Sequence, residues 1–375
     1  MNILHVIPSV AAADGGPSRA IIEIERALAA RGLKCTTVTS NVGLAEVLPI
    51  GRPVATAFAM RWYFPATTGF YKASLGLARW LARNIGDFDV LHAHALFSFA
   101  PVIAAHLARR AGVPYVLRPL GVLNAYGMQE RRPWLKKLSL ALIERRLIES
   151  AGAVHFTSIA EQTEAEALGL RCKSVVIPLG VELPQAGRRA RKRGGPFVLL
   201  FLGRIDPKKN IESLLRALAR LPETVRLQIA GNGASDYVRR LRALAAELGV
   251  EKRVEWLGYI EGVRKAAALQ RAHAFVLPSH SENFGIAVVE ALACGLPCIV
   301  SQQVAIAPAI AQARAGIVTG QDPVSIAKGI DALRAGPAGY RAMSAAARTL
   351  AQRSFSSAAM GERLEALYRG LARAG

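Results

Sequence analysis

The sequence predicts an α/β protein with two doubly wound domains, and three observations support this. The chain has 375 residues, which is too many for one typical hydrophobic core. Short β-branched or apolar runs alternate with longer amphipathic runs, as strands and helices of a parallel sheet do. The alternation stops at residues 184–196, PQAGRRARKRGGP, and then starts again. This basic stretch lacks an apolar face and is interpreted as a linker, with nucleic-acid contact as the alternative.

The first half alternates in this way from its first residues. We expect strands at 3–7, 35–39, 89–92, 115–118, 153–156 and 174–177, and helices at 17–30, 100–111, 133–150 and 159–168. Buried strands that alternate with helices form parallel sheets, and ligands bind at the carboxyl ends of such strands.

The second half repeats the pattern. We expect strands at 197–202, 226–230, 254–257, 274–277, 298–300 and 316–318, and helices at 211–220, 237–248, 285–294, 324–334 and 340–373, the last broken near Phe355. The expected domains are 1–185 and 197–354, joined by the linker 186–196, with a C-terminal helical segment at 355–375. The carboxyl ends of the two sheets are expected to face a cleft.

The charge balance indicates an anionic partner. The chain carries 48 Lys and Arg against 27 Asp and Glu, a net charge of +21. Nucleic acid, anionic lipid and phosphate-bearing substrates all fit this charge, and so does an arginine-rich surface without a ligand. Aromatic residues make up only 6% of the chain and are dispersed, which disfavours a nucleic-acid-binding protein.

Cysteine spacing and hydropathy indicate the compartment. The four cysteines are scattered and show neither metal-site spacing nor a disulfide framework. The N-terminal MNILHVIPSV starts like a strand and lacks the features of a signal peptide. The longest uncharged apolar stretch, 95–105, is too short to span a bilayer and contains Pro101. We expect a cytoplasmic protein, either free or peripheral on the inner face of the plasma membrane.

Two carboxylates stand out in SHSENFGIAVVEALACGLPC, residues 279–298. Glu282 precedes an expected helix, and Glu290 lies inside it among apolar residues. A lone carboxylate in such a helix is costly unless it is paired or binds a ligand. The backbone N–H groups of Asn283, Phe284 and Gly285 are expected to point toward an anion.

A basic turn, GRIDPKKN at 203–210, follows the expected strand 197–202. Gly203 would let a ligand approach the backbone closely. Arg204 and Lys209 are expected to project toward the same edge of the sheet. A fork of donors and a point charge together suit a diphosphate, although a charged loop without a ligand would look the same.

These residues resemble the retaining glycosyltransferases of family four, which have the GT-B architecture. The resemblance covers nearly the whole chain and rests on the Glu282 and Glu290 pair, the Arg204 and Lys209 pair, the early glycines at 15–16, and PLGVE at 178–182. It implies two Rossmann-like domains facing a cleft and a C-terminal helix that returns to the first domain. It also implies a nucleotide-sugar substrate and neither a cofactor nor a metal.

The resemblance implies a role for each residue in the second half. Arg204 and Lys209 would neutralise the diphosphate as it leaves. Glu282 would bind hydroxyls of the transferred hexose, and Glu290 would bind the ribose. Gly258 and Tyr259 would lie against the base through backbone groups.

It also implies roles in the first half. Gly16 would bring backbone donors to the phosphate, and His94 would lie near the reacting sugar. His92 is interpreted as structural, and a metal bound by the two histidines is an alternative without an evident third ligand. Arg118 is a weaker candidate for contact with the acceptor.

Two basic, apolar segments could contact a membrane. The pattern of residues 131–148 predicts a basic amphipathic helix with Trp134 near its start. The apolar face of this helix either contacts a membrane or packs into the core. Trp62, Tyr63 and Phe64 beside Arg61 are a second candidate. A membrane-bound first domain would suit a lipid-linked acceptor, such as a polyprenyl diphosphate oligosaccharide in polysaccharide assembly.

The sequence therefore predicts a retaining glycosyltransferase that moves a hexose from a UDP- or GDP-sugar to a glycan or lipid-linked acceptor in cell-surface polysaccharide synthesis. A GT-B epimerase that acts on the nucleotide-sugar itself is the alternative enzyme, and a nucleic-acid-binding protein is the alternative outside enzymes.

Overall fold

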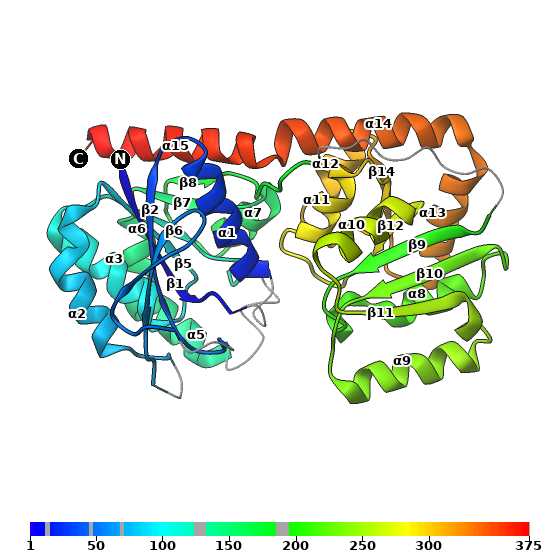
Figure 1. Cartoon of the computed structure of the whole chain (residues 1–375), viewed down its shortest axis with the longest axis horizontal. Coiled ribbons are helices and arrows are strands. Elements are labelled where there is room, and N and C mark those ends of the chain that lie inside the picture. The colour runs from blue at the N-terminus through cyan, green and yellow to red at the C-terminus, as the bar shows by residue number, and fades with distance from the viewer. Residues whose placement is uncertain (12–15, 45–47, 68–70, 124–132, 185–194, 375) are drawn as a thin grey trace. The chain divides into compact units, whose positions relative to one another are not determined.

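The computed structural model spans residues 1–375 and describes all of them except 12–15, 45–47, 68–70, 124–132, 185–194 and 375. The chain divides into two compact units (Figure 1). Unit 1 contains Met1–Gly180 and Ser357–Gly375, and unit 2 contains Val181–Ser356. Most of the expected linker lies outside the described residues.

The described strands of unit 1 form one sheet of eight. Their bounds are β1 Asn2–Ser9, β2 Lys34–Ser40, β3 Pro53–Ala55, β4 Met60–Phe64, β5 Val90–His94, β6 Tyr115–Arg118, β7 Ala153–Phe156 and β8 Ser174–Val176. The order is β3-β4-β2-β1-β5-β6-β7-β8, and all described pairs are parallel except β3 with β4. The inner strands are apolar on both faces because helices cover both.

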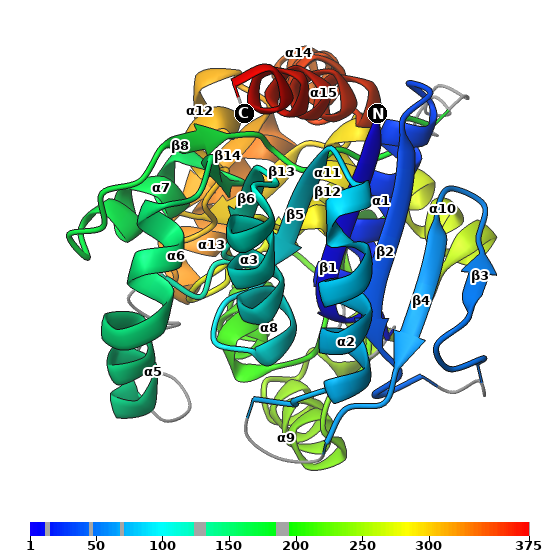
Figure 2. The same ribbon diagram turned by 90° about the vertical axis from the view of Figure 1, so that its left-hand side faces the viewer.

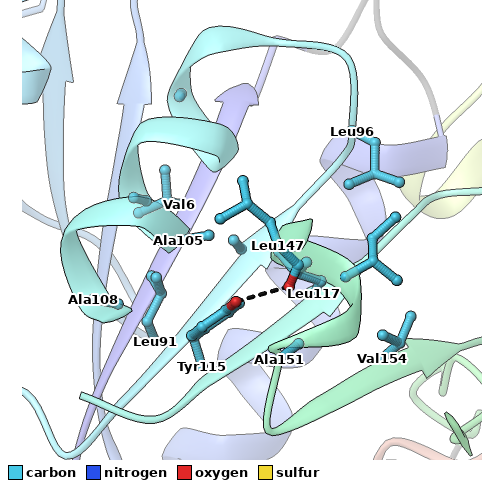
Figure 3. Packing of buried hydrophobic residues seen from close by; sticks show 14 of the residues in the cluster. Val6, Leu91, Leu96, Ala105, Ala108, Tyr115, Leu117, Leu147, Ala151 and Val154 are labelled. Atoms are coloured by element: carbon cyan, nitrogen blue, oxygen red, sulfur yellow. Dashed lines mark hydrogen bonds between the residues drawn. The ribbon is translucent and has the colours of Figure 1, made fainter. Parts of the chain in front are cut away.

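Helices cover both faces of this sheet. They are α1 Gly16–Ala29, α2 Leu75–Asn84, η2 Ile85–Asp87, α3 Phe99–Ala111, α5 Pro133–Ser139, the π-helix η3 Leu140–Glu144, α6 Arg145–Glu149, α7 Ile159–Glu166 and α15 Ser357–Ala374. Figure 2 shows α2 and α3 in front of the sheet, with α1 behind β2. Between α3 and the strands lies a core of small and branched side chains (Figure 3). The Tyr115 hydroxyl crosses this core and donates to the carbonyl of Leu147 at 2.7 Å, which ties β6 to α6.

The C-terminal helix α15 is part of unit 1. Met360, Leu364 and Tyr368 recur every four residues on one face, and all three are fully buried. The helix packs against α1, where the guanidinium of Arg31 pairs with the carboxylate of Glu365. The C-terminal helix therefore packs as part of the same unit as the N-terminal residues.

The described strands of unit 2 form a second parallel sheet, in the order β11-β10-β9-β12-β13-β14. The strands are β9 Phe197–Leu202, β10 Val225–Ala230, β11 Val254–Gly258, β12 Ala274–Leu277, β13 Cys298–Ser301 and β14 Gly316–Thr319. The helices are η4 Pro207–Lys209, α8 Ile211–Leu218, α9 Ser235–Glu247, η5 Glu251–Arg253, α10 Gly262–Arg271, α11 Ile286–Ala293, α12 Ala307–Gln312, α13 Pro323–Ala335 and α14 Pro337–Ser354.

The structure corrects one candidate membrane contact. Met60–Phe64 is strand β4, in which Tyr63 and Phe64 are 4% and 5% exposed. Trp62 packs against Trp80 of α2, with ring centroids 5.1 Å apart. These aromatic side chains therefore belong to the interior of unit 1. Among the described helices, none is both long and apolar enough to cross a membrane.

Candidate functional site

Three neighbouring strands of unit 2 end at glycines. Gly203 follows β9, Gly231 follows β10, and Gly258 ends β11. The N–H of Gly203 donates to the carbonyl of Ala230 at 3.0 Å, and the N–H of Gly231 donates to the carbonyl of Gly258 at 2.8 Å. The carboxyl edge of the sheet is thus bare backbone at three adjacent strand ends, where a ligand can approach closely. Sequence reasoning had found Gly203 and Gly258 but not Gly231.

Gly231 is the most constrained of the three. Its φ is +146°, and a Cβ placed there would lie 1.8 Å from the carbonyl oxygen of Gly203. We expect Gly231→Ala to displace the Gly203 turn and to lower the free energy of unfolding by about 3 kcal/mol or more. Gly339→Ala in α14 is the control. The added Cβ meets open space, so the free energy of unfolding should stay the same or rise. Urea denaturation of both variants checks this, and equal stabilities would contradict the constraint.

A tight turn after Gly203 positions Lys209. Asp206 caps η4 by accepting from the N–H of Lys208 at 3.0 Å. Asn210 adopts a left-handed conformation, with φ of 55°, and its side-chain amide donates to the carbonyl of Pro278 at 3.1 Å. The N–H of His280 donates to the carbonyl of Lys208 at 2.8 Å. These bonds join the basic turn to the loop that carries Glu282.

Lys209 and Glu282 form an ion pair in this site. Both side chains are less than one-fifth exposed. The backbone of Glu282 is fixed on both sides, because its N–H donates to Gln303 and its carbonyl accepts from Ala305. Arg204 is exposed on the turn after β9, and no hydrogen bond or ion pair with a described residue engages its guanidinium. The structure thus brings one of the two predicted cations, Lys209, to the predicted carboxylate of Glu282.

The helix that follows begins one residue later than expected. Helix α11 starts at Ile286, and Gly285 is its N-cap with φ of 83°. Phe284 is 4% exposed and packs edge-on against Phe355, so its side chain belongs to the core of unit 2. Among the described hydrogen bonds, none uses the N–H of Ile286 or Ala287. The N–H groups of Phe284 and Gly285 likewise take part in none of the described hydrogen bonds, so they too are open to an anion, and the expected role of Asn283, Phe284 and Gly285 stays a prediction.

Glu290 has a partner that sequence reasoning missed. Nζ of Lys265 in α10 lies 3.0 Å from Oε1 of Glu290, and the two side chains are 14% and 11% exposed. This pairing explains how the apolar helix α11 tolerates a carboxylate. The sequence offered no signal for Lys265, because helix α10 itself was not predicted. At the end of β11, Gly258 has φ of 65°, and Tyr259 is 58% exposed with its hydroxyl donating to Glu261.

In unit 1, His94 belongs to a fully buried histidine cluster. His5, His92 and His155 are 0% exposed as well, and Arg118 is 2% exposed. The Nε2–H of His155 donates to the carbonyl of Ile177 at 2.7 Å. Nδ1 of His155 then accepts from Nε2–H of His92 at 3.4 Å. With its proton on Nε2, His92 uses Nδ1 to accept from the Tyr368 hydroxyl at 2.7 Å. Both imidazoles of this hydrogen-bonded series are neutral, because burial lowers the pKa of His155 to about 3 and holds the pKa of His92 well below its usual range.

His94 contacts Arg118 and His5. Its Nδ1 lies 3.5 Å from Nη1 of Arg118, which can only donate, so Nε2–H of His94 donates to Nδ1 of His5 at 3.0 Å. Burial, together with the positive charge of Arg118, lowers the pKa of His5 to about 3. Burial also holds the pKa of His94 well below its usual range, with His5 and Arg118 adding to the effect. His94 is therefore a neutral imidazole at physiological pH.

The cluster supplies the third imidazole that the sequence did not reveal. One nitrogen each from His5, His92 and His94 lie within 4.8 Å of one another. Burial lowers the pKa of Arg118 only to about 10, so a guanidinium cation stands beside His94 at neutral pH. A divalent ion would meet this charge in a fully buried region of low dielectric constant, which opposes its binding. Gly16, the other first-half candidate, is exposed as the first residue of α1, and Gly15 lies outside the described residues.

Comparison with known proteins places both halves of the chain in one class. Residues 15–180 match the family described as "Glycosyl transferase 4-like domain", and residues 185–350 match "Glycosyl transferases group 1". A phosphatidyl-myo-inositol mannosyltransferase of Mycobacterium leprae is 29% identical over 80% of this chain and 78% of its own length. A D-inositol 3-phosphate glycosyltransferase of Acidothermus cellulolyticus is 35% identical over 67% of this chain and 60% of its own length.

Solved structures show the same fold. The sucrose-phosphate synthase of Thermosynechococcus elongatus superposes with a TM-score of 0.81 at 22% identity, over 100% of both chains. Anabaena HepE in complex with UDP-glucose superposes with a TM-score of 0.78 at 19% identity, over 99% of this chain and 100% of its own. The two family matches together cover every described strand except β1, and they include the unit 2 site described above. The chain therefore belongs to the family-four glycosyltransferases and has the GT-B fold.

Proposed function

We propose that this glycosyltransferase moves a hexose from a nucleoside diphosphate sugar to a hydroxyl group of a glycan or lipid-linked acceptor, with retention of the anomeric configuration. The observation that carries the proposal is the site at the carboxyl edge of the unit 2 sheet. There Lys209 pairs with Glu282, Lys265 pairs with Glu290, and Arg204 and the start of α11 offer further donors to an anion. One ligand with hydroxyl groups and a diphosphate uses all of these groups.

In the proposed reaction, the bond between the anomeric carbon and the diphosphate oxygen breaks, and a bond to the acceptor oxygen forms on the same face. The acceptor proton passes to the departing phosphate oxygen. Arg204, Lys209 and the N–H groups of Ile286 and Ala287 stabilise the negative charge that develops on the diphosphate. Because protein cations carry this charge, we propose that transfer needs no metal ion.

The carboxylates orient the donor. Glu282 would accept hydrogen bonds from hydroxyl groups of the hexose, and Glu290 would accept them from hydroxyl groups of the ribose. The similar structure of HepE contains UDP-glucose, a ligand with both sugars. Lys265 holds the Glu290 carboxylate in place before the ribose arrives. We extend the proposal to a cytoplasmic role in cell-surface polysaccharide synthesis, because the basic chain suits phosphate-bearing substrates.

A turnover assay tests this function. UDP-, GDP- and ADP-hexoses are incubated with the protein, with and without total lipid or oligosaccharide fractions, and nucleoside diphosphate release is followed. The proposal expects release that depends on an acceptor, with an axial donor giving an axial product by NMR. Conversion of the donor to another sugar without an acceptor would identify an epimerase. Inversion at the anomeric carbon would contradict retention.

A further inference from the structure

The helical segment α5–η3–α6 of unit 1 carries apolar side chains on two opposite faces. One face enters the core through Leu140, Leu147 and Ile148, which are 7%, 7% and 1% exposed. The other face is open to water and consists of Trp134, Leu138, Leu142 and Ile143, at 66%, 50%, 72% and 42% exposure. The sequence had left open whether the face of Leu135, Leu138, Leu142 and Ile143 packs into the core. The structure leaves the last three exposed and Leu135 partly buried.

Three of the exposed residues form one stripe. Trp134, Leu138 and Leu142 follow one another at intervals of four residues, so they lie on successive turns of the same helical face. In Figure 2 helix α5 lies at the lower left, apart from the strands of the sheet. A contiguous apolar stripe on the surface of a soluble unit usually marks an interaction site.

A basic pocket adjoins this stripe. It has a volume of about 340 Å³ and is lined by Arg109 of α3 and by Ala141, Arg145, Arg146, Glu149 and Ser150. Arg145 is used within the fold, because it donates to the carbonyls of Leu168 and Gly169. Arg109 and Arg146 are exposed, and among the described residues no hydrogen bond or ion pair engages either guanidinium. Two arginines are thus available to an anionic group from outside.

We propose that this face, Trp134, Leu138, Leu142 and Ile143 together with Arg109 and Arg146, docks unit 1 on an anionic phospholipid surface. The apolar side chains enter the boundary between headgroups and acyl chains, and the two arginines bind lipid phosphates. A chain with a net charge of +21 is drawn to such a surface over about a Debye length. This membrane association does not depend on which sugar the enzyme transfers.

A lipid surface fits this face better than a second copy of the chain. In a two-fold symmetric contact the same patch meets itself, so the contact would contain Arg109 and Arg146 from both copies. Like charges at a contact oppose association, whereas lipid phosphates neutralise them. The apolar stripe and the positive charge are therefore both satisfied only by an anionic amphiphilic surface.

Vesicle co-sedimentation tests the proposal. The full chain is mixed with vesicles of phosphatidylcholine alone or with about one-third phosphatidylglycerol, at low and high salt. We expect binding to the anionic vesicles that weakens as salt rises. Leu142→Asp and the double variant Arg109→Glu with Arg146→Glu should each reduce the bound fraction at least about tenfold. Circular dichroism and nucleotide binding by unit 2 establish that the variants are folded.

Ile159→Asp is the matched control, because Ile159 is 73% exposed on α7 of the same unit but lies outside the stripe. It should bind vesicles like the wild type. Three results would overturn the proposal: no sedimentation with anionic vesicles, equal binding to neutral vesicles, or unchanged binding by Leu142→Asp. A wild-type dimer in gel filtration that Leu142→Asp dissociates would overturn it too, since the stripe would then join two copies.

Discussion

Replacing Lys209 by Met, or Glu282 by Gln, is expected to lower turnover by at least about 100-fold. Each change removes a charge that faces the reacting end of the proposed donor. Lys209 would meet the diphosphate as its negative charge grows, and Glu282 would fix the hexose hydroxyl groups. Because the two side chains form an ion pair, each variant also leaves one charge without its partner. We expect this to cost about 1–3 kcal/mol of stability, too little to unfold the chain.

The matched control is another ion pair of unit 2, Arg239 with Asp236 on α9. Both of its side chains are 76% exposed, so Arg239→Met should change neither turnover nor stability measurably. Initial rates and thermal melts are measured for all variants under the same conditions. Full turnover in Lys209→Met or Glu282→Gln would remove these residues from the reaction.

Acidification below about pH 6.5 is expected to destabilise unit 1, because of its buried histidines. The pKa of His5 and of His155 falls to about 3 in the folded protein, chiefly through burial. An unfolded histidine has a pKa near 6.5. Between these values the unfolded chain binds more protons, so stability is complete above pH 6.5 and decreases as the pH falls toward 3.

The expected effect is large. Each such histidine contributes about 1.4 kcal/mol per pH unit, so His5 and His155 together cost about 4 kcal/mol at pH 5. His92 and His94 act in the same direction, since burial lowers the pKa of both. The free energy of unfolding of a typical domain is only about 5–15 kcal/mol.

Urea denaturation at a series of pH values measures this slope. We expect His155→Gln to reduce it by about 1.4 kcal/mol per pH unit, because one buried imidazole is gone. His106 on the exposed side of α3 provides the control, and His106→Gln should leave the slope unchanged. Stability that is flat between pH 6.5 and 5 would show that the cluster takes up protons without unfolding.

Much of the fold could be predicted because buried parallel strands leave a clear pattern. Tyr115–Arg118, Phe197–Leu202 and Ala274–Leu277 have the predicted bounds, and each is a short apolar run that ends at a turn. Strand β4 was missed because its aromatic residues stand beside Arg61 and resemble a surface patch. Only the structure reveals that Arg61 pairs with Glu25, a buried residue of α1.

The candidate site was predicted in part. Arg204, Lys209, Glu282 and Glu290 could be found because their types and spacing are unusual in strand-to-helix turns. Lys265 and His5 could not, because each joins its cluster only through tertiary packing of elements far apart in sequence. The exposed stripe on α5 and η3 was unpredictable for a related reason. Amphipathicity alone does not show which apolar face of a helix the core covers.

Calorimetric titration of UDP, GDP, ADP and their sugars into the wild type and Glu290→Gln tests the central claim most directly. The claim is that the unit 2 site binds a nucleoside diphosphate sugar through its two Lys–Glu pairs and Arg204. It predicts that at least one of these nucleotides binds one to one, and that Glu290→Gln weakens this binding at least about tenfold by losing the ribose contact. Binding by Glu290→Gln with wild-type affinity, or no binding by any of the nucleotides, would contradict it.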